Sequence, residues 1–549
     1  MELAAHQAAV IGAAHACASE PPAAGFRAGH AEAAQDDERV GFAIGGAVPT
    51  GPRRSEWHHT ALLVVADVVG TGVLSLPGHF GALGWLPGLL LLAGCALLNL
   101  YTGMLLVQCK LWYPRVRSLG ELAAEVAGPR IAALTHGVVY GYIFLGCGNY
   151  LLVLSKSLQS IWPQLCRPHA GVAGMACLFL PNHLRTLTAI APLSVFSNFT
   201  IVVAIAICLG AASRGVAPPA AGSSAPLVAP ALAPWSAFSA LSGSIFAFSG
   251  QKIYLEIMSE MRDVARFAQA LCAAMASILV LYVLACVRTY AVWGLDSPAY
   301  LLDVLRGGEK KVAGMLMFLH VLISFTISQQ VLNRAIHDRI APGQPKALAD
   351  PEGTRSRLLW SLLTTTTMLC AWAVANLVPF FADFVDLVGA LASAPLSFLL
   401  PAALFAAAHR RRSGRVGLGR RDALLVPVCC LVTVLIMVFG TASSAGSLQA
   451  HFHDRGAPFS CLAEQPGEER AAREHPSPKR GPGGTQRRLV GLPVNFGGLA
   501  CSPSGPFKQP SAWGAAHLIC CASFSSATSV KHAWGKAEHL FGGKRSSPW

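Results

Sequence analysis

The chain has 549 residues, of which 53% are hydrophobic and 13% are charged, and its formal net charge at pH 7 is +14. Soluble globular chains carry about 25% charged residues, so the composition excludes that class and indicates an all-α, multi-pass integral membrane protein. In a soluble protein this positive charge would suggest a nucleic-acid partner. Here the basic residues lie mainly between apolar runs, so the expected surroundings are a lipid bilayer and no nucleic acid.

Composition divides the chain into three regions. Residues 1–55 are rich in Ala, Gly, Pro and charge, and we expect a disordered cytosolic segment. Residues 56–440 hold the apolar runs and form the expected transmembrane domain. Residues 441–549 lose apolar periodicity, so we expect a low-complexity, disordered tail that the fold does not need.

About eleven membrane spans are predicted from the apolar runs. About 20 apolar residues cross a bilayer as a helix. The expected spans are 59–82, 86–108, 131–160, 170–184, 190–212, 236–258, 267–293, 312–334, 358–380, 384–408 and 422–440.

Loop charge predicts the orientation of these spans. With the N-terminus in the cytosol, the inner loops hold most of the loop Arg and Lys, including the Arg410–Arg412 run. This distribution follows the positive-inside rule. An odd number of spans then puts the C-terminus on the outer side.

The motifs of enzymes and of cysteine frameworks are missing from the sequence. It contains no HExxH, no GxSxG and no Walker loop, so we expect neither an enzyme nor a bound cofactor or metal. None of the sixteen cysteines forms a CxxC pair, and ten lie in or beside apolar runs, where they act as small apolar residues. No disulfide framework can be predicted.

The first span, HHTALLVVADVVGTGVLSLPGHFGALGWLP, is interrupted. Asp67 lies inside it, and Gly70-Thr71-Gly72 and Pro77 follow. Backbone groups freed at membrane depth must face protein, water or a ligand. One interpretation is a glycine-rich helix packed closely on its neighbours. The other is a discontinuous helix whose broken ends bind a solute.

The sixth span, SAFSALSGSIFAFSGQKIYLEIM, is interrupted in a similar way at Ser249, Gly250 and Gln251. Lys252 and Glu256 follow, and charges inside a span are costly unless they are paired or face a cavity. The two are four residues apart, so they can pair on one helix face. The alternative is that residues 249–252 are unwound and line a solute site.

Interruptions in spans one and six match a transporter built from two inverted repeats of five spans. Spans 1–5 and 6–10 would form the halves, with the eleventh appended. The N-termini of half-helices carry partial positive charge and unpaired N–H groups, which suit a carboxylate. Their C-termini offer carbonyls to a cation or an ammonium group.

The stretches ADVVGTGVLSLP, GALGW, FAFSGQKIYLEIMSEM and FVDLVGALASAPLSFLLPAALF resemble the amino acid/auxin permease family of transmembrane amino acid transporters. Spans three (140–162) and five (190–205) resemble it too, and the resemblance covers about 55–440. It implies a fold like that of the bacterial leucine transporter, with broken helices one and six. It also implies amino acid transport, often driven by protons.

The resemblance implies that six residues at the two interruptions bind the substrate, and the chemistry of the side chains adds Phe246 and three ion-coupling residues. The expected substrate-binding residues are Gly70, Thr71, Gly72, Phe246, Ser249, Gly250 and Gln251, and the expected ion-coupling residues are Asp67, Ser324 and Glu256. Phe246 would cap the bound side chain or simply pack. Tyr140 and Tyr150 in span three would offer hydroxyls to the solute or anchor the span at the interface.

We therefore expect a monomeric secondary-active transporter that moves amino acids with H⁺ by alternating access, in the plasma or vacuolar membrane. Asp67 is the expected proton carrier, because an ionised carboxylate at that depth is costly. Na⁺ is the alternative coupling ion, and an auxin-like carrier is the alternative within the class. From another class, the alternative is an amino-acid sensor with the same fold.

Overall fold

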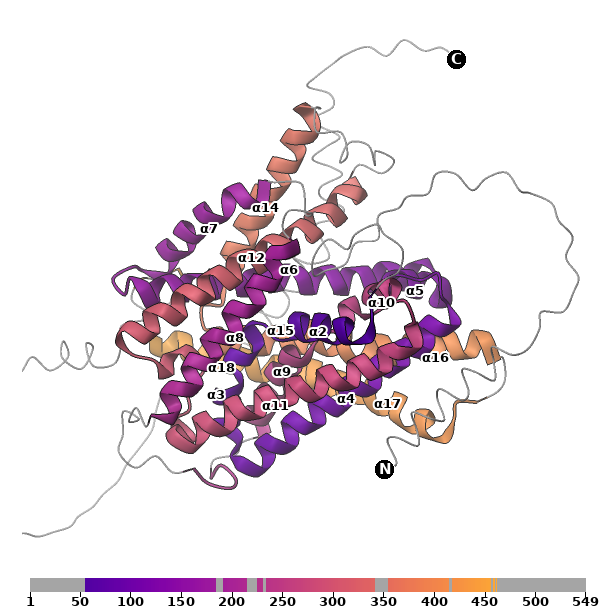
Figure 1. Cartoon of the computed structure of the whole chain (residues 1–549), viewed down its shortest axis with the longest axis horizontal. Coiled ribbons are helices and arrows are strands. Elements are labelled where there is room, and N and C mark those ends of the chain that lie inside the picture. Colours follow the sequence, from indigo (N-terminus) through magenta and orange to yellow (C-terminus); the bar gives the residue numbers. More distant parts are fainter. Residues whose placement is uncertain are drawn as a thin grey trace, which may run out of the picture. The chain divides into compact units, whose positions relative to one another are not determined.

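The computed structural model describes residues 55–183, 191–214, 225–230, 234–340, 354–413, 417–455, 458–459 and 461 (Figure 1). Over these ranges the chain is helical, and its β-structure is limited to one isolated bridge between Ser55 and Met261. The elements in chain order are α2 (Trp57–Val68), η1 (Thr71–Leu74), α3 (Leu76–Leu83), α4 (Trp85–Trp112), α5 (Leu119–Ala127), α6 (Pro129–Ile161), α7 (Arg167–His183), α8 (Ala191–Ser213), α9 (Pro234–Phe248), α10 (Gln251–Glu260), η2 (Val264–Arg266), α11 (Phe267–Trp293), η3 (Gly294–Asp296), η4 (Leu301–Val304), α12 (Gly307–Ile340), α14 (Thr354–Leu377), α15 (Phe381–Val388), η5 (Gly389–Ser393), η6 (Pro395–Leu399), α16 (Leu400–Ser413), α17 (Arg420–Leu435), η7 (Ile436–Gly440) and α18 (Thr441–Arg455).

Eight helical segments of the described chain are long and apolar enough to cross a membrane. They span Trp85–Trp112, Pro129–Ile161, Val195–Ser213, Val264–Asp296, Gly307–His337, Leu358–Leu377, Phe381–Ser413 and Arg420–His453. Large apolar side chains such as Leu62, Leu90 and Phe199 stay exposed on the helices, as expected of surfaces that face lipid. The protein is thus an all-α integral membrane protein, while the count of eleven spans and the five-plus-five repeat stay predictions.

Both predicted interruptions are present. The first apolar segment ends as a helix at Val68, passes through Val69 and Gly70 into the short η1, and resumes as α3 at Leu76. The second ends at Phe248 and resumes at Gln251 as α10. Proline marks where the helix resumes, because Pro77 fits the first turn of α3, where an N–H is not needed.

A third segment departs from regular helix. Between α15 and α16 the chain forms two π-helical turns, η5 and η6. Gly389 opens η5 against α9, where a β-carbon on this residue would lie 2.0 Å from the carbonyl oxygen of Ser242. The wide turns therefore bring the backbone of this segment onto α9, just before the second break. Such turns often occur at functional sites.

The last helical segment extends beyond the boundary expected at residue 440. Helix α18 continues for 15 residues to Arg455, and Ser443 and Ser444 on it are buried. Ser447 Oγ donates to Asp383 Oδ1 at 2.7 Å, and His451 Nδ1 lies 2.5 Å from Asp383 Oδ2. The tail expected from 441 therefore includes a packed helix. Most of that tail, and the N-terminal segment up to residue 54, lie outside the described residues.

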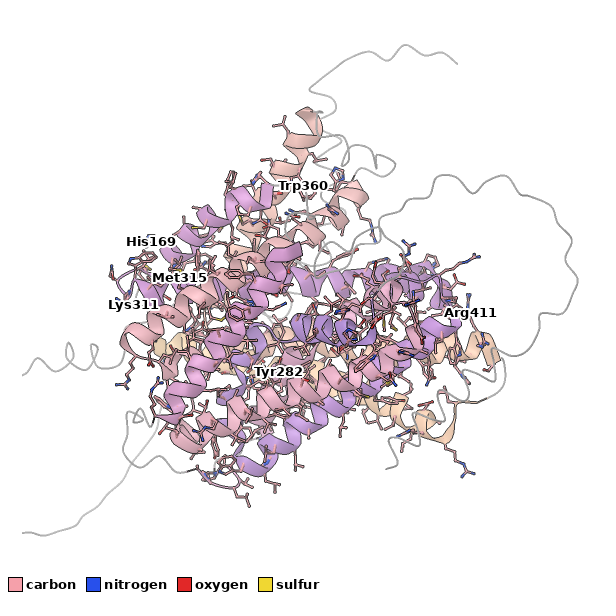
Figure 2. The ribbon with its side chains drawn as sticks, in the orientation of Figure 1. His169, Tyr282, Lys311, Met315, Trp360 and Arg411 are labelled. Atoms are coloured by element: carbon pink, nitrogen blue, oxygen red, sulfur yellow. A yellow bond between two sulfur atoms is a disulfide. The ribbon has the colours of Figure 1, made fainter. Side chains whose placement is uncertain are left out.

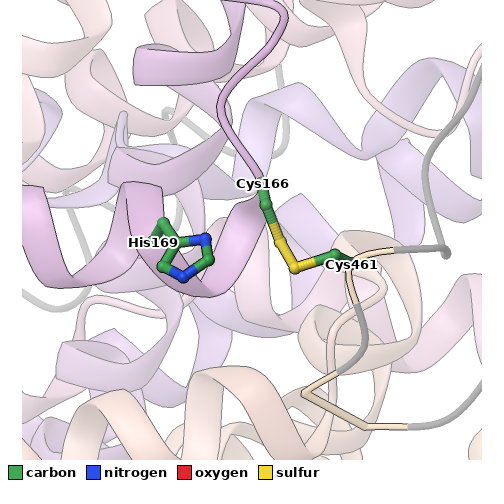
Figure 3. A group of neighbouring side chains, drawn as sticks. All are labelled: Cys166, His169 and Cys461. Atoms are coloured by element: carbon green, nitrogen blue, oxygen red, sulfur yellow. A yellow bond between two sulfur atoms is a disulfide. The ribbon is translucent and has the colours of Figure 1, made fainter.

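One disulfide bond, which the sequence did not indicate, joins Cys166 before α7 to Cys461 after α18 (Figure 3). The ring of His169 lies beside it, and the ligand atoms of the three residues are within 4.8 Å of one another. The ten cysteines of the apolar runs are free, as expected. Because disulfides persist in oxidising compartments, the bond supports the expected placement of both segments on the non-cytosolic side.

The charged ends of the helices fit the same orientation. In Figure 2, Arg411 at the end of α16 and Lys311 at the start of α12 lie on opposite sides of the view. The expected inner loops contain Arg411, and the expected outer loops contain Lys311. We use the name non-cytosolic end for the end with the disulfide.

Truncation tests the role of α18. A chain ending at residue 440 loses the helix, leaves buried Asp383 without Ser447 and His451, and should melt at a lower temperature than the full chain. Each lost hydrogen bond to a buried charge costs about 1.5–3 kcal/mol. The measurement is thermal unfolding in detergent, followed by size-exclusion chromatography.

A chain ending at residue 465 is the matched control, because it keeps α18 and Cys461. It should melt like the full chain. Equal melting temperatures for the 440 and 465 variants would show that α18 adds nothing to stability.

Candidate functional site at the helix breaks

The two breaks contact each other reciprocally. A β-carbon on Gly72, after the first break, would lie 2.6 Å from the Cα of Ala247, just before the second. A β-carbon on Gly250, in the second break, would lie 2.8 Å from a methyl carbon of Val68, just before the first. Each break thus packs against the end of the other half-helix, and glycine permits both close approaches.

Tyr282 of α11 ties the same two helix ends together. Tyr282 is labelled in Figure 2. Its hydroxyl lies 2.8 Å from the carbonyl oxygen of Ala247 and 3.2 Å from that of Val68, and the side chain is fully buried. A phenol donates one proton, which these two carbonyls share. Helix ends inside a membrane leave carbonyl groups without hydrogen-bond donors, and lipid tails have none to offer. The Tyr282 hydroxyl supplies the donor. Tyr282 was not predicted from the sequence.

Thr71 and Ser249, two of the predicted substrate-binding residues, are held by neighbouring helices. Asn149 Nδ2 of α6 donates to Thr71 Oγ1 at 2.6 Å. Ser249 Oγ donates to the carbonyl oxygen of Ile245 and lies 2.9 Å from Ser397 Oγ of η6. The contacts connect one break to α6 and the other to the π-helical segment.

Gln251, another predicted substrate-binding residue, points into the protein. It is fully buried, and its Nε2 donates to Asn99 Oδ1 at 2.8 Å and to Thr102 Oγ1 at 3.1 Å, both on α4. Its Oε1 accepts from the N–H of Gly250 at 3.1 Å. All these partners are protein groups, so the side chain fixes the second break against α4.

Open space lies at Gly70, where a β-carbon would meet no other heavy atom within 4 Å. Aromatic rings border the region, since Phe246 lies against Gly72 and its ring centroid is 6.1 Å from that of Tyr142 on α6. Lys252 Nζ lies 5.7 Å from the centre of the Tyr142 ring. Tyr142, which was not predicted from the sequence, thus borders the site. The predicted Tyr150 lies within electrostatic reach of Lys252 and Asp67, while Tyr140 stacks on His136.

An ion pair connects the two broken helices at their breaks. Lys252 Nζ lies 2.6 Å from Asp67 Oδ2, and the side chains are 10% and 11% exposed. The sequence left Lys252 pairing with Glu256 as one alternative, but the structure pairs it with Asp67. Separating two such charges from water is costly, and leaving one of them alone is costlier still.

Ser324, a predicted ion-coupling residue, belongs to a polar cluster between α8 and α12. Ser197 Oγ lies 3.4 Å from Ser324 Oγ and 3.0 Å from His320 Nδ1. His320 is buried and was not singled out from the sequence. Glu256, the other predicted residue, is partly buried on α10.

The geometry suits a zwitterionic solute. Helices α3 and α10 both start at the breaks, and the partial positive charge of a helix N-terminus favours an anion. The half-helices α2 and α9 end in carbonyl groups at the breaks. Open space lies at Gly70, just after the end of α2. Two discontinuous helices in contact are the arrangement in which many transporters bind their solutes.

Comparison with known proteins gives the family. Residues 53–445 match the family described as transmembrane amino acid transporter protein, and the chain belongs to it. Its members and the relatives below are transporters, with no catalytic activity indicated.

Three relatives illustrate the similarity. The chain is 26% identical over 431 residues to amino acid transporter AVT3C of Arabidopsis thaliana, covering 72% of this chain and 92% of the relative. It is 24% identical over 431 residues to the N amino acid transport system protein of Neurospora crassa, covering 74% and 88%. It is 24% identical over 409 residues to vacuolar amino acid transporter 3 of Saccharomyces cerevisiae, covering 72% and 56%.

Two glycine substitutions separate solute binding from packing. Gly70→Ala adds a methyl group to open space at extended backbone angles (φ −132°, ψ −150°), so the protein should fold normally and bind substrate more weakly. Gly72→Ala drives the same group into Ala247 and should destabilise the protein by about 1–3 kcal/mol. Thermal unfolding and substrate binding are measured on both variants. Normal affinity in a well-folded Gly70→Ala would exclude that residue from the site.

Tyr282→Phe tests the shared hydroxyl. The change keeps the ring and removes the donor, leaving two buried carbonyls without it, so stability should fall by about 1–3 kcal/mol. Tyr290→Phe on the same helix is the control, because its hydroxyl bonds only to the carbonyl oxygen of Pro226, away from the breaks. Substrate affinity should fall in Tyr282→Phe alone, and equal losses in both variants would contradict the prediction.

Proposed function

We propose that this protein is a secondary-active transporter that carries an amino acid together with a proton by alternating access. The observation that carries the proposal is the Asp67–Lys252 ion pair, which links α2 to α10 at the point where both helices break. A titratable group placed there can sense both the substrate and the arrangement of the half-helices.

The substrate is a free amino acid in its zwitterionic form. Its carboxylate would bind the N–H groups at the starts of α3 and α10, and its ammonium group the carbonyls at the ends of α2 and α9. Gly70 leaves room for the main chain of the ligand, and Phe246 and Tyr142 would contact its side chain. The relatives' names, all of amino acid transporters, support this class of substrate.

A proton would act by changing the ion pair. With Asp67 ionised, the attraction to Lys252 holds α2 against α10. When Asp67 takes up a proton, Lys252 loses its counter-charge and the two half-helices can separate. The attraction is large at this depth because the surroundings have a low dielectric constant.

The remaining features of the proposal concern the setting. One chain contains both broken helices, so a monomer is the working unit. H⁺ is the proposed coupling ion, and replacing Na⁺ by K⁺ in the assay tests the alternative. The name of the yeast relative supports the vacuolar membrane over the plasma membrane.

Uptake into proteoliposomes tests the function. Purified protein is supplied with a panel of labelled amino acids, with and without an inward proton gradient. Accumulation of one or more amino acids that collapses when the gradient is dissipated is the expected result. No uptake or exchange of any amino acid would exclude the function.

The pair Asp67→Asn and Lys252→Gln tests the proton carrier. Either change alone strands a buried charge, and breaking a buried pair in that way costs about 3–5 kcal/mol. The double variant removes both charges and should fold. It should exchange substrate across the membrane yet lose accumulation driven by the proton gradient.

Two measurements make this test decisive. Counterflow exchange reports the substrate site, and gradient-driven uptake reports coupling. A double variant that keeps the wild-type dependence on the proton gradient would rule out Asp67 as the carrier.

A further inference from the structure

A second buried acid–base pair lies on the other side of the breaks. His79 Nε2 of α3 is 2.7 Å from Asp386 Oδ1 of α15, and the two side chains are 8% and 5% exposed. From the sequence, Asp386 is expected at the outer vestibule or the interface, and His79 was not singled out. Neither residue belongs to the site described above. The pair joins a half-helix of the first broken segment to a helix 300 residues later in the chain.

The surroundings of this pair fix it in place. Ser239 Oγ of α9 donates to Asp386 Oδ2 at 2.5 Å. Gly243, one helical turn further along α9, lies directly beneath, because a β-carbon there would come within 2.1 Å of the His79 ring and 2.2 Å of Asp386 Oδ1. Two half-helices, α3 and α9, and helix α15 thus meet at one point.

Several other titratable groups lie on the elements that pack against α3 and α15, and their contacts are with residues other than His79 and Asp386. Asp383 on α15 contacts His451 of α18, and Asp303 of η4 is 2.9 Å from Lys310. Lys156 of α6 lies over the ring of Tyr300. Asp296 of η3 is exposed, and Tyr290 of α11 packs on Phe80. Over the described residues, α9 itself carries no acidic or basic side chain.

We propose that His79 and Asp386 form a proton-operated latch that closes the non-cytosolic end of the transport path. The proposal rests on the proposed function, since it names a second proton site and assigns it a regulatory role. A proton from water on the non-cytosolic side adds to the imidazole of His79, which becomes an imidazolium next to the Asp386 carboxylate. No other bond forms or breaks.

The net charge of the pair predicts whether protonation of His79 favours the closed or the opened arrangement. When His79 is neutral, the closed arrangement buries one uncompensated carboxylate, and when His79 is protonated the pair is neutral overall. A buried charge without a counter-charge is costly, while an opened arrangement gives water to both groups. Protonation therefore favours closure of α3 and α9 on α15.

The two pairs contact different halves of the broken helices. Asp67 and Lys252 join α2 to α10, and His79 and Asp386 join α3 to α15. A proton loosens the first pair and tightens the second. Acid on the non-cytosolic side would thus close the non-cytosolic end of the transport path. The same protons would separate α2 from α10 at the cytosolic end. Transport into the cytosol requires closure of the first end and opening of the second.

Hydrogen exchange of full-length protein in proteoliposomes tests the latch at pH 5.5 and pH 7.5, with rates corrected for intrinsic exchange. In the wild type, peptides covering α3 should be better protected at the lower pH. His79→Gln removes titration and should give weak protection at both values. His79→Lys keeps a positive charge and should give strong protection at both values.

His451→Gln is the matched control, because it breaks a similar contact to the same helix but leaves the half-helices alone. It should keep the wild-type pH difference in α3. Asp386→Asn provides a second route if a His79 variant folds poorly, with protection of α6 as the measure of folding. It should abolish the pH difference.

The outcomes separate the latch from the proposed function. A pH difference in α3 that survives His79→Gln, or that is missing from the wild type, would overturn the latch even if amino acids are transported. A protein that transports no amino acid yet shows the His79-dependent difference retains the latch and loses the proposed function.

Discussion

The structure depends on one constraint: backbone groups at a helix break inside a membrane need partners that lipid does not provide. The protein meets this need by bringing its two breaks together. Gly72 and Gly250 let each break approach the end of the other half-helix, and Tyr282 bonds to the last carbonyls of both. Thr71, Ser249 and Gln251 then tie the breaks to α6, η6 and α4.

The packing of the half-helices also brings charged side chains into contact. The half-helices α2, α3, α9 and α10 meet around the breaks, and each half of the first broken segment has a largely buried titratable side chain that is paired, Asp67 on α2 and His79 on α3. Each of these pairs with a charge on another element, Lys252 on α10 and Asp386 on α15. The attraction between such groups is strong at low dielectric, so small changes in protonation can shift the balance between arrangements.

Local sequence predicted the helical class, both breaks and the family, because glycine, proline and charge inside apolar runs have direct effects on a helix. Local sequence did not predict which residues the polar and charged side chains contact. Lys252 is four residues from Glu256 but contacts Asp67, 185 residues away. Gln251 turns towards Asn99 instead of open space, and Tyr142, Tyr282, His79 and Asp386 look like ordinary span residues until the helices are packed. The end of the domain was placed too early because α18 is short on apolar residues, and its anchor, Asp383, lies 64 residues upstream.

The disulfide has a consequence for biogenesis. Cys166 and Cys461 are 295 residues apart, and every helix from α7 to α18 lies between them. Oxidation therefore has to wait until the ribosome has released α18 and the segment around Cys461 has reached the compartment that contains Cys166. Formation of this bond marks the correct placement of α18, so a quality-control system that monitors free thiols would recognise chains in which α18 has failed to insert.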